Sequence, residues 1–169
     1  MPGESNKTIY EECIDREIKN ALQGYNTSIL VYGVTGSGKT HTVFGSLGYR
    51  DSANTDELGL VYYGFKRLVE EKGCSVGLSY MEVYNEQVKD LLGEEDNLLL
   101  TENADGDVIV QGLSYRPVDT FEQMINCIKA GNNRRKVAQT MVNVFSSRSH
   151  AILQLIVKKK SGQTISVSK

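Results

Sequence analysis

A glycine-rich segment has the residue types and spacing of a phosphate-binding loop. It satisfies G-x-x-x-x-G-K-[ST] without a mismatch, through Gly33, Val34, Thr35, Gly36, Ser37, Gly38, Lys39 and Thr40. Glycines allow the backbone to wrap closely around phosphate with its N–H groups pointing inward. Lys39 supplies a positive charge for the β- and γ-phosphates, and the Thr40 hydroxyl is placed to ligate Mg²⁺. The segment therefore predicts a nucleoside triphosphate site and not an ordinary glycine-rich surface turn.

Such a loop needs a strand before it and a helix after it. The apolar run at residues 28–32 predicts a buried strand, and a helix is expected to begin at Lys39. A loop of this kind also works with an Asp at the end of an apolar strand, which holds the Mg²⁺ shell. No run of four apolar residues followed by Asp occurs in the chain. The acidic half of the phosphate chemistry is therefore expected outside these residues.

The remaining pattern alternates between strands and helices. Helices are predicted at residues 9–23, 60–72 and 87–92, and from a capping box at Thr120 and Gln123 to a stop at Gly131. Strands are predicted at residues 74–84, 151–157 and 164–167, a hairpin from residues 98–100 and 108–110, and a polar loop at residues 48–59. This alternation is typical of an α/β fold.

Composition excludes several classes of protein. No apolar run approaches the ~20 residues of a membrane span, and the N-terminus is too polar for a signal peptide. Cys13, Cys74 and Cys127 lie too far apart in sequence for a zinc motif or a disulfide framework. They are expected to be buried, reduced thiols of a cytosolic protein.

Charge is distributed unevenly along the chain. All 21 acidic residues lie at or before Glu122, whereas the last 47 residues carry nine Lys or Arg. Such a region can be an arm that binds a polyanion, or a folded region whose acidic partners lie elsewhere. The nine charges are spread over predicted helix, loop and strand, which favours a solvated face and argues against a nucleic-acid partner.

Three segments together resemble the kinesin motor domain. The first is ALQGYN at residues 21–26 with VYG at 31–33 and the phosphate-binding loop, followed by His41 and Thr42. The second is SYMEVYNE at residues 79–86, followed by DLL at 90–92. The third is NVFSSRSH at residues 143–150, which resembles the kinesin switch I motif N-x-x-S-S-R-S-H. The chain departs from the usual family pattern at Val34, where most kinesins have Gln, and at Val43, where Met is usual.

The resemblance implies a kinesin-type P-loop NTPase fold, with a central mixed β-sheet flanked by helices on both faces and incomplete at both ends. It implies ATP and Mg²⁺ as cofactors, with Thr40 and Ser147 at the metal. His41 would lie near the adenine. Asn143, Ser146 and Ser147 would form the switch I rim over the γ-phosphate, where hydroxyls suit the Mg²⁺-bound or attacking water. Arg148 would pair with a switch II glutamate.

The whole of residues 1–169 is expected to be one partial motor domain, with the P-loop at 33–40 and switch I at about 140–150. The family's first strand, switch II, main microtubule-binding helix and neck linker are not found in the sequence. The resemblance implies an ATP-driven motor on microtubules, cytoplasmic and cytoskeletal, with no membrane partner. This chain alone is expected to hydrolyse ATP poorly. The alternative is a truncated, non-motor module that binds nucleotide or a partner on a kinesin-like scaffold.

Overall fold

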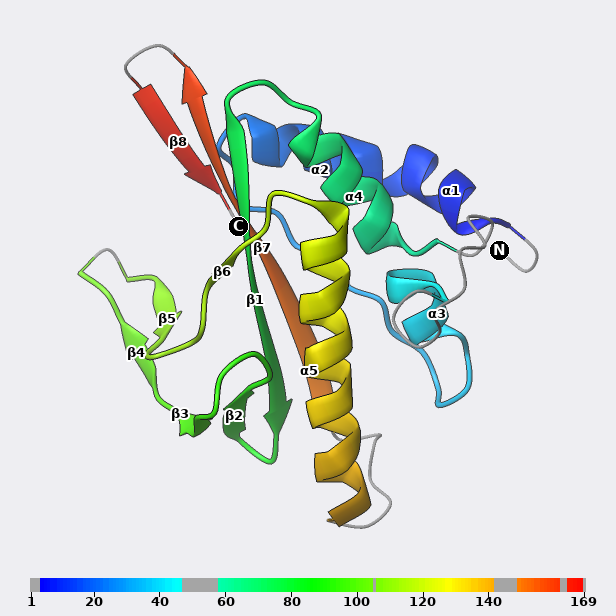
Figure 1. Ribbon diagram of the computed structural model, residues 1–169, viewed down its shortest axis with the longest axis vertical. Helices are drawn as coiled ribbons and strands as arrows, with labels where there is room; N and C mark the ends of the chain where they lie inside the picture. Colours follow the sequence, from blue (N-terminus) through cyan, green and yellow to red (C-terminus); the bar gives the residue numbers. More distant parts are fainter. Residues whose placement is uncertain (1–3, 47–57, 105, 142–148, 162–163, 169) are drawn as a thin grey trace.

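The computed structural model describes residues 4–46, 58–104, 106–141, 149–161 and 164–168. Its centre is an antiparallel sheet in the order β3-β2-β1-β7-β8, with β6 also paired to β1 (Figure 1). The strands are β1 (Cys74–Tyr84), β2 (Gln87–Asp90), β3 (Asp96–Leu98), β6 (Arg116–Pro117), β7 (Ser149–Ser161) and β8 (Thr164–Ser168). The predictions of strands at 74–84, 151–157 and 164–167 are confirmed.

The long pair β1 and β7 forms the middle of the molecule. Its register runs from Cys74 opposite Lys159 to Tyr84 opposite Ser149. Alternate residues of a strand point to the same face of the sheet. On β1, the alternate residues Val76, Leu78 and Tyr80 are all buried in the main hydrophobic core. The surrounding helices pack against the sheet through this core.

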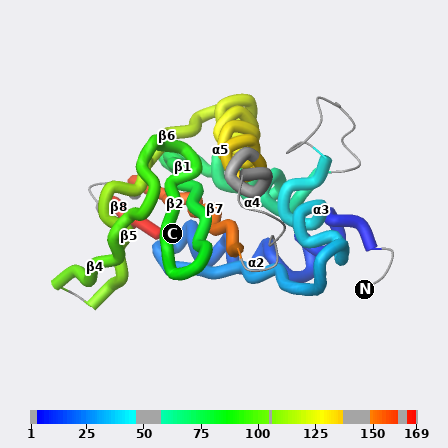
Figure 2. Tube along the Cα trace, turned by 90° about the horizontal axis from the view of Figure 1, so that it is seen from below, coloured from blue at the N-terminus to red at the C-terminus, as the bar shows by residue number. Residues whose placement is uncertain are grey.

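The helices lie to one side of the view, and a separate hairpin projects to the other (Figures 1 and 2). The helices are α1 (Asn6–Ile9), a π-helical turn (Tyr10–Ile14), α2 (Asp15–Leu22), α3 (Lys39–Phe44), α4 (Leu60–Val69) and α5 (Phe121–Met141). The predicted hairpin is present as β4 (Leu100–Glu102) paired with β5 (Val108–Val110), although its first strand begins two residues later than predicted. None of the helices among the described residues has the length and apolar character needed to cross a membrane.

The N-terminal helical segment and the start of α5 match the sequence pattern. Residues 6–22 are helical throughout, and the chain turns at Gly24 with φ +94°. At the start of α5, the Gln123 N–H donates to Thr120 Oγ1 at 3.2 Å, and Gln123 Oε1 accepts from the Thr120 N–H at 3.2 Å. These reciprocal bonds are the predicted capping box.

The prediction of a helix at residues 87–92 is wrong, because β2 occupies residues 87–90. Asn85 and Glu86 have φ values of +49° and +63°, and they connect Tyr84 to its partner Gln87. Two consecutive residues with positive φ match the right-handed twist of a two-residue hairpin. The turn therefore sends the chain back along β1 as a paired strand.

The prediction of a strand at residues 28–32 is also wrong. Residues 25–32 form no strand with any described residue, and Leu30 and Tyr32 are 84% and 85% exposed. A strand is held by hydrogen bonds to a neighbouring strand, so an apolar run without such a neighbour stays extended and unpaired. The loop predicted at 48–59 falls mainly outside the described residues.

Glu71 joins α4 to β7 at the surface. Its carboxylate accepts from Lys159 Nζ at 2.8 Å and from Arg67 Nη1 at 3.1 Å. The hydrogen bond from Lys159 has the larger effect and that from Arg67 the next largest, and together they hold the pKa of Glu71 below its ordinary value of 4.5. Because the folded-state pKa is the lower one, the stabilisation is complete above pH 4.5 and is lost as the pH falls through the folded-state pKa.

We expect Glu71→Gln to destabilise the chain at pH 7, with a difference from the wild type that shrinks as the pH falls below about 4.5. Urea unfolding at a series of pH values measures this difference. Glu70→Gln is the matched control, because the ion pair of Glu70 with Lys66 is 3.9 Å long and both side chains are more than half exposed. A Glu71→Gln difference that stayed constant down to pH 3 would contradict the expectation.

Candidate functional site

The predicted phosphate-binding loop lies between the extended residues 25–32 and α3. Gly36 and Gly38 have φ values of +84° and +93°, a region that side chains rarely adopt. Gly33 has a φ of +152°, which is also strained for other residues, and a Cβ there would lie 2.6 Å from Ser37 Oγ. The Ser37 N–H donates to the Val34 carbonyl at 3.1 Å and closes the turn. The backbone is thus a tight loop that depends on its glycines.

Lys39 begins α3 and folds back over this loop. Its Nζ donates to the carbonyls of Gly33 at 2.8 Å and Val34 at 2.9 Å. Both hydrogen bonds are exposed to solvent. Replacing them with hydrogen bonds to water therefore costs little free energy. The amino group of Lys39 therefore lies at the phosphate-binding loop and can leave these carbonyls to bind an anion.

The residues of the loop fit a triphosphate with Mg²⁺. A Cβ built on Gly36 or Gly38 would meet nothing within 4 Å, so the outer side of the loop is open to a ligand. Lys39 is a point charge for phosphate, and Thr40 follows it on the first turn of α3 with a hydroxyl that can ligate a metal. Within the described ranges no group of three or more His, Cys, Asp or Glu could hold a metal ion. Thr40 could help to hold such a metal through its hydroxyl oxygen, together with phosphate oxygens of the ligand.

The N-terminal helix holds α3 in place through one side chain. Asn6 Nδ2 donates to the His41 carbonyl at 3.1 Å and to the Leu58 carbonyl at 3.0 Å. It thus ties the phosphate-loop helix to the residues that lead into α4. The sequence offered no signal for this role, because a single Asn before an amphipathic helix fits no motif. The side chain of His41 itself is exposed on α3.

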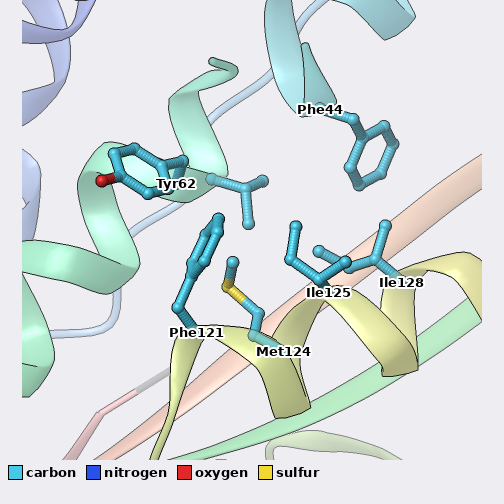
Figure 3. Close-up of a pocket in the computed structure, with 7 residues that line it drawn as sticks. Phe44, Tyr62, Phe121, Met124, Ile125 and Ile128 are labelled. Atoms are coloured by element: carbon cyan, nitrogen blue, oxygen red, sulfur yellow. The ribbon is translucent and has the colours of Figure 1, made fainter. Parts of the chain in front are cut away.

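An apolar pocket supports α3 from the side of the core (Figure 3). Phe44 at the end of α3 lines it together with Tyr62 of α4 and the α5 side chains Phe121, Met124, Ile125 and Ile128. The Tyr62 and Phe121 rings pack edge to face with centroids 4.6 Å apart. The enclosed space is about 10 Å³, which at most accommodates a single water. The side chains around this small packing gap anchor α3, and the gap itself is too small for a ligand.

The second predicted part of the site is not described. Asn143, Ser146, Ser147 and Arg148 all lie outside the described residues. The elements on either side of them are described: α5 ends at Met141 and β7 begins at Ser149. The structure thus places Gly33, Val34, Thr35, Gly36, Ser37, Gly38, Lys39, Thr40 and His41 together, and the switch I residues remain a prediction.

The comparison with protein families decides what this loop and sheet belong to. The kinesin motor domain model matches residues 1–169. The chain belongs to the kinesin motor domain family.

Individual kinesins show the same relationship. The chain is 37% identical to mouse kinesin-like protein KIF18A over 152 residues, which cover 90% of this chain and 17% of that protein. It is 35% identical to chicken KIF18B over 165 residues, 94% of this chain and 20% of that protein. The chain therefore spans about a fifth of the length of these curated relatives.

A solved structure of a fast kinesin superposes on this chain with a TM-score of 0.87 at 28% identity. The match covers 98% of this chain and 48% of the other one. The predicted α/β, kinesin-type P-loop fold is confirmed by this likeness. In this kinesin fold, β1 carries residues 79–84 of the segment SYMEVYNE, whose last two residues form the turn to β2, and α5 precedes the segment with the SSRSH motif in sequence.

Sequence reasoning missed a buried polar cluster beside the end of α5. Glu82 of β1 is only 4% exposed and pairs with Arg135 of α5. In the sequence, Glu82 belongs to the SYMEVYNE segment and Arg135 is one of the nine basic residues of the last 47, and neither pattern indicates that the two residues pair. The sequence contained one signal, which is the spacing of these residues. Tyr80 and Glu82 are two apart on a strand and so share one face of it, while Asn132 and Arg135 are three apart on a helix and so share one face of that helix.

Proposed function

We propose that this chain is the ATP-binding part of a kinesin-like microtubule motor, which in the full-length protein couples ATP hydrolysis to movement along microtubules. The observation that carries the proposal is the loop at residues 33–40, with Lys39 Nζ at 2.8 Å and 2.9 Å from two loop carbonyls inside a kinesin fold. The family match and the kinesin relatives support the motor assignment.

Each residue of the site would have a separate task. The backbone N–H groups of residues 33–40 would surround the phosphates, and Lys39 would neutralise their charge. The hydroxyls of Thr40 and Ser147 would ligate Mg²⁺, which supplies electrostatic stabilisation of the charge that develops on the phosphate oxygens. His41 would lie beside the base.

The switch I residues would report the nucleotide state. Asn143 and Ser146 would lie at the rim of the γ-phosphate site and orient the attacking water through their polar side chains. Arg148 would pair with a switch II glutamate supplied by the longer motor. Coupling a γ-phosphate to a distant binding surface through such segments is a common switching mechanism, and the proposed surface binds microtubules in the cytoskeleton.

Titration of the purified chain with fluorescent ATP and GTP analogues in the presence of Mg²⁺ tests the nucleotide assignment. We expect saturable binding with a preference for ATP. Co-sedimentation with microtubules on the same sample tests the track assignment. Nucleotide binding without co-sedimentation would favour the non-motor module, and absence of both from a folded chain would overturn the proposal.

A further inference from the structure

An open groove lies between α5 and the residues that follow β2. Its lining includes Leu91, which is 2% exposed, and the short side chains of Cys127 and Ala130. Arg116 of β6 and Arg134 of α5 also line it. Its volume of about 480 Å³ is within the range of small-molecule sites. This groove is therefore large enough for a ligand, unlike the packing gap at the end of α3.

Hydrogen bonds hold the wall of the groove in place. The Asp90 carboxylate, only 1% exposed, accepts from the Leu92 N–H at 2.8 Å. Arg116 Nη2 donates to the Leu92 carbonyl at 3.1 Å. From the other side, Arg134 Nη2 donates to the Glu94 carbonyl at 2.8 Å. These bonds fix the loop after β2 and both guanidinium groups, as expected of a pre-formed ligand site.

The groove carries positive charge. None of the described residues that line it is acidic. Asp96 contacts Arg134 at 3.1 Å and Lys89 at 3.3 Å, so one carboxylate is shared by two bases. Arg116 makes no ion pair with any residue that the structure describes. Burial raises the pKa of the Cys127 thiol and the charge of Arg116 opposes this rise, so that charge acts inside the groove.

Both guanidinium groups retain donors for a ligand. Arg116 and Arg134 each use only Nη2 in hydrogen bonds with described residues. Their Nε and Nη1 groups carry further N–H donors. The parallel N–H groups of a guanidinium match the two oxygens of a carboxylate or of a phosphate. The groove thus combines donors for an anion with apolar surface beside them.

We propose that this groove binds a small organic anion. Arg116 and Arg134 hold the carboxylate or phosphate of the ligand, and its apolar body packs against Leu92, Cys127 and Ala130. This site is separate from the proposed nucleotide site, because none of the residues 33–40, all of which the structure describes, lines the groove.

Phenyl phosphate is the probe, titrated into the ¹⁵N-labelled chain and followed by NMR. We expect saturable shifts of the backbone amides of Leu92, Cys127 and Ala130. Inorganic phosphate lacks the apolar body and benzyl alcohol lacks the charge, so each should bind at least about tenfold more weakly. Benzoate shows whether the site prefers a carboxylate or a phosphate, and saturable binding of either anion at these residues supports the proposal.

Two variants remove the two halves of the site separately. Arg116→Gln should weaken the binding of phenyl phosphate by at least about tenfold. Ala130→Leu keeps both guanidinium groups but fills the groove, so it should weaken phenyl phosphate by at least about tenfold and inorganic phosphate by less than about threefold. Ala130 is exposed on α5 and leucine is a good helix former, so this variant keeps the fold.

Arg16→Gln is the matched control and should retain the full affinity, because Arg16 is an exposed arginine of α2 that does not line the groove. Equal affinities of Arg116→Gln and Arg16→Gln for phenyl phosphate would overturn the inference. So would the absence of saturable binding of phenyl phosphate and benzoate up to about 10 mM. Binding that Lys39→Ala removes would belong to the phosphate-binding loop, which would overturn the inference and leave the proposed function standing.

Discussion

Lys39→Ala is expected to remove saturable Mg·ATP binding by this chain. The variant loses the only charged side chain among residues 33–40. A hydrogen bond to a charged group contributes up to about 3 kcal/mol, which corresponds to about 100-fold in affinity. Titration with a fluorescent ATP analogue measures the loss directly.

The same change should leave the fold intact. The two bonds from Lys39 to the loop carbonyls are exposed, and surface contacts of this kind rarely change stability by more than about 0.5 kcal/mol. The melting temperature should therefore stay within about 2 °C of the wild type. Lys66→Ala is the matched control, because Lys66 is also a helical surface lysine and lies on α4, away from the loop. Equal nucleotide affinity of the two variants would show that the loop does not bind phosphate.

Gly131→Ala is expected to destabilise the chain by about 2 kcal/mol, although alanine is the better helix former by about 1 kcal/mol. A Cβ at this position would lie 2.3 Å from Cδ1 of Tyr80 and 3.4 Å from Cβ of Leu91. Tyr80 cannot yield, since it is fully buried in the core of β1 and bonded to Asn132. The helix must therefore move away from the sheet, and the measurement is urea unfolding.

Gly64→Ala in α4 is the matched control for Gly131→Ala. Its new Cβ would lie 3.2 Å from Cδ1 of Ile18, the flexible end of a side chain that can shift. We expect a change in unfolding free energy within about 1 kcal/mol, since the gain in helix propensity offsets the crowding. Equal effects at the two positions would contradict the assignment of Gly131 to close packing against Tyr80.

Gly131 also shows where sequence reasoning went wrong. A glycine after an apolar helical pattern predicts a helix end, yet α5 continues to Met141. The glycine is present because Tyr80 lies against the helix at that point. No local pattern distinguishes a glycine that ends a helix from one that admits a neighbouring ring, because the ring comes from a strand some fifty residues earlier.

Residues 28–32 show the same limit for strands. Their apolar composition is that of a buried strand, but the described residues provide no neighbour for them to pair with. A helix carries its hydrogen-bond partners within its own segment, whereas a strand depends on another segment. This is why the helices at residues 6–22 and 60–69 followed from periodicity, while one predicted strand was wrong and β2 was missed.

The sequence by itself determined the family, the phosphate-binding loop and the capping box of α5, because each depends on residues close together in the chain. Only the tertiary structure decided that Glu82, Arg135 and Ser149 form one buried cluster, and that Asn6 holds α3 through the carbonyl of His41. These contacts join residues separated by 14 to 53 positions. Their existence depends on the register of β1 with β7 and on the rotation of α5, which are set by packing of the whole core and by no local sequence pattern.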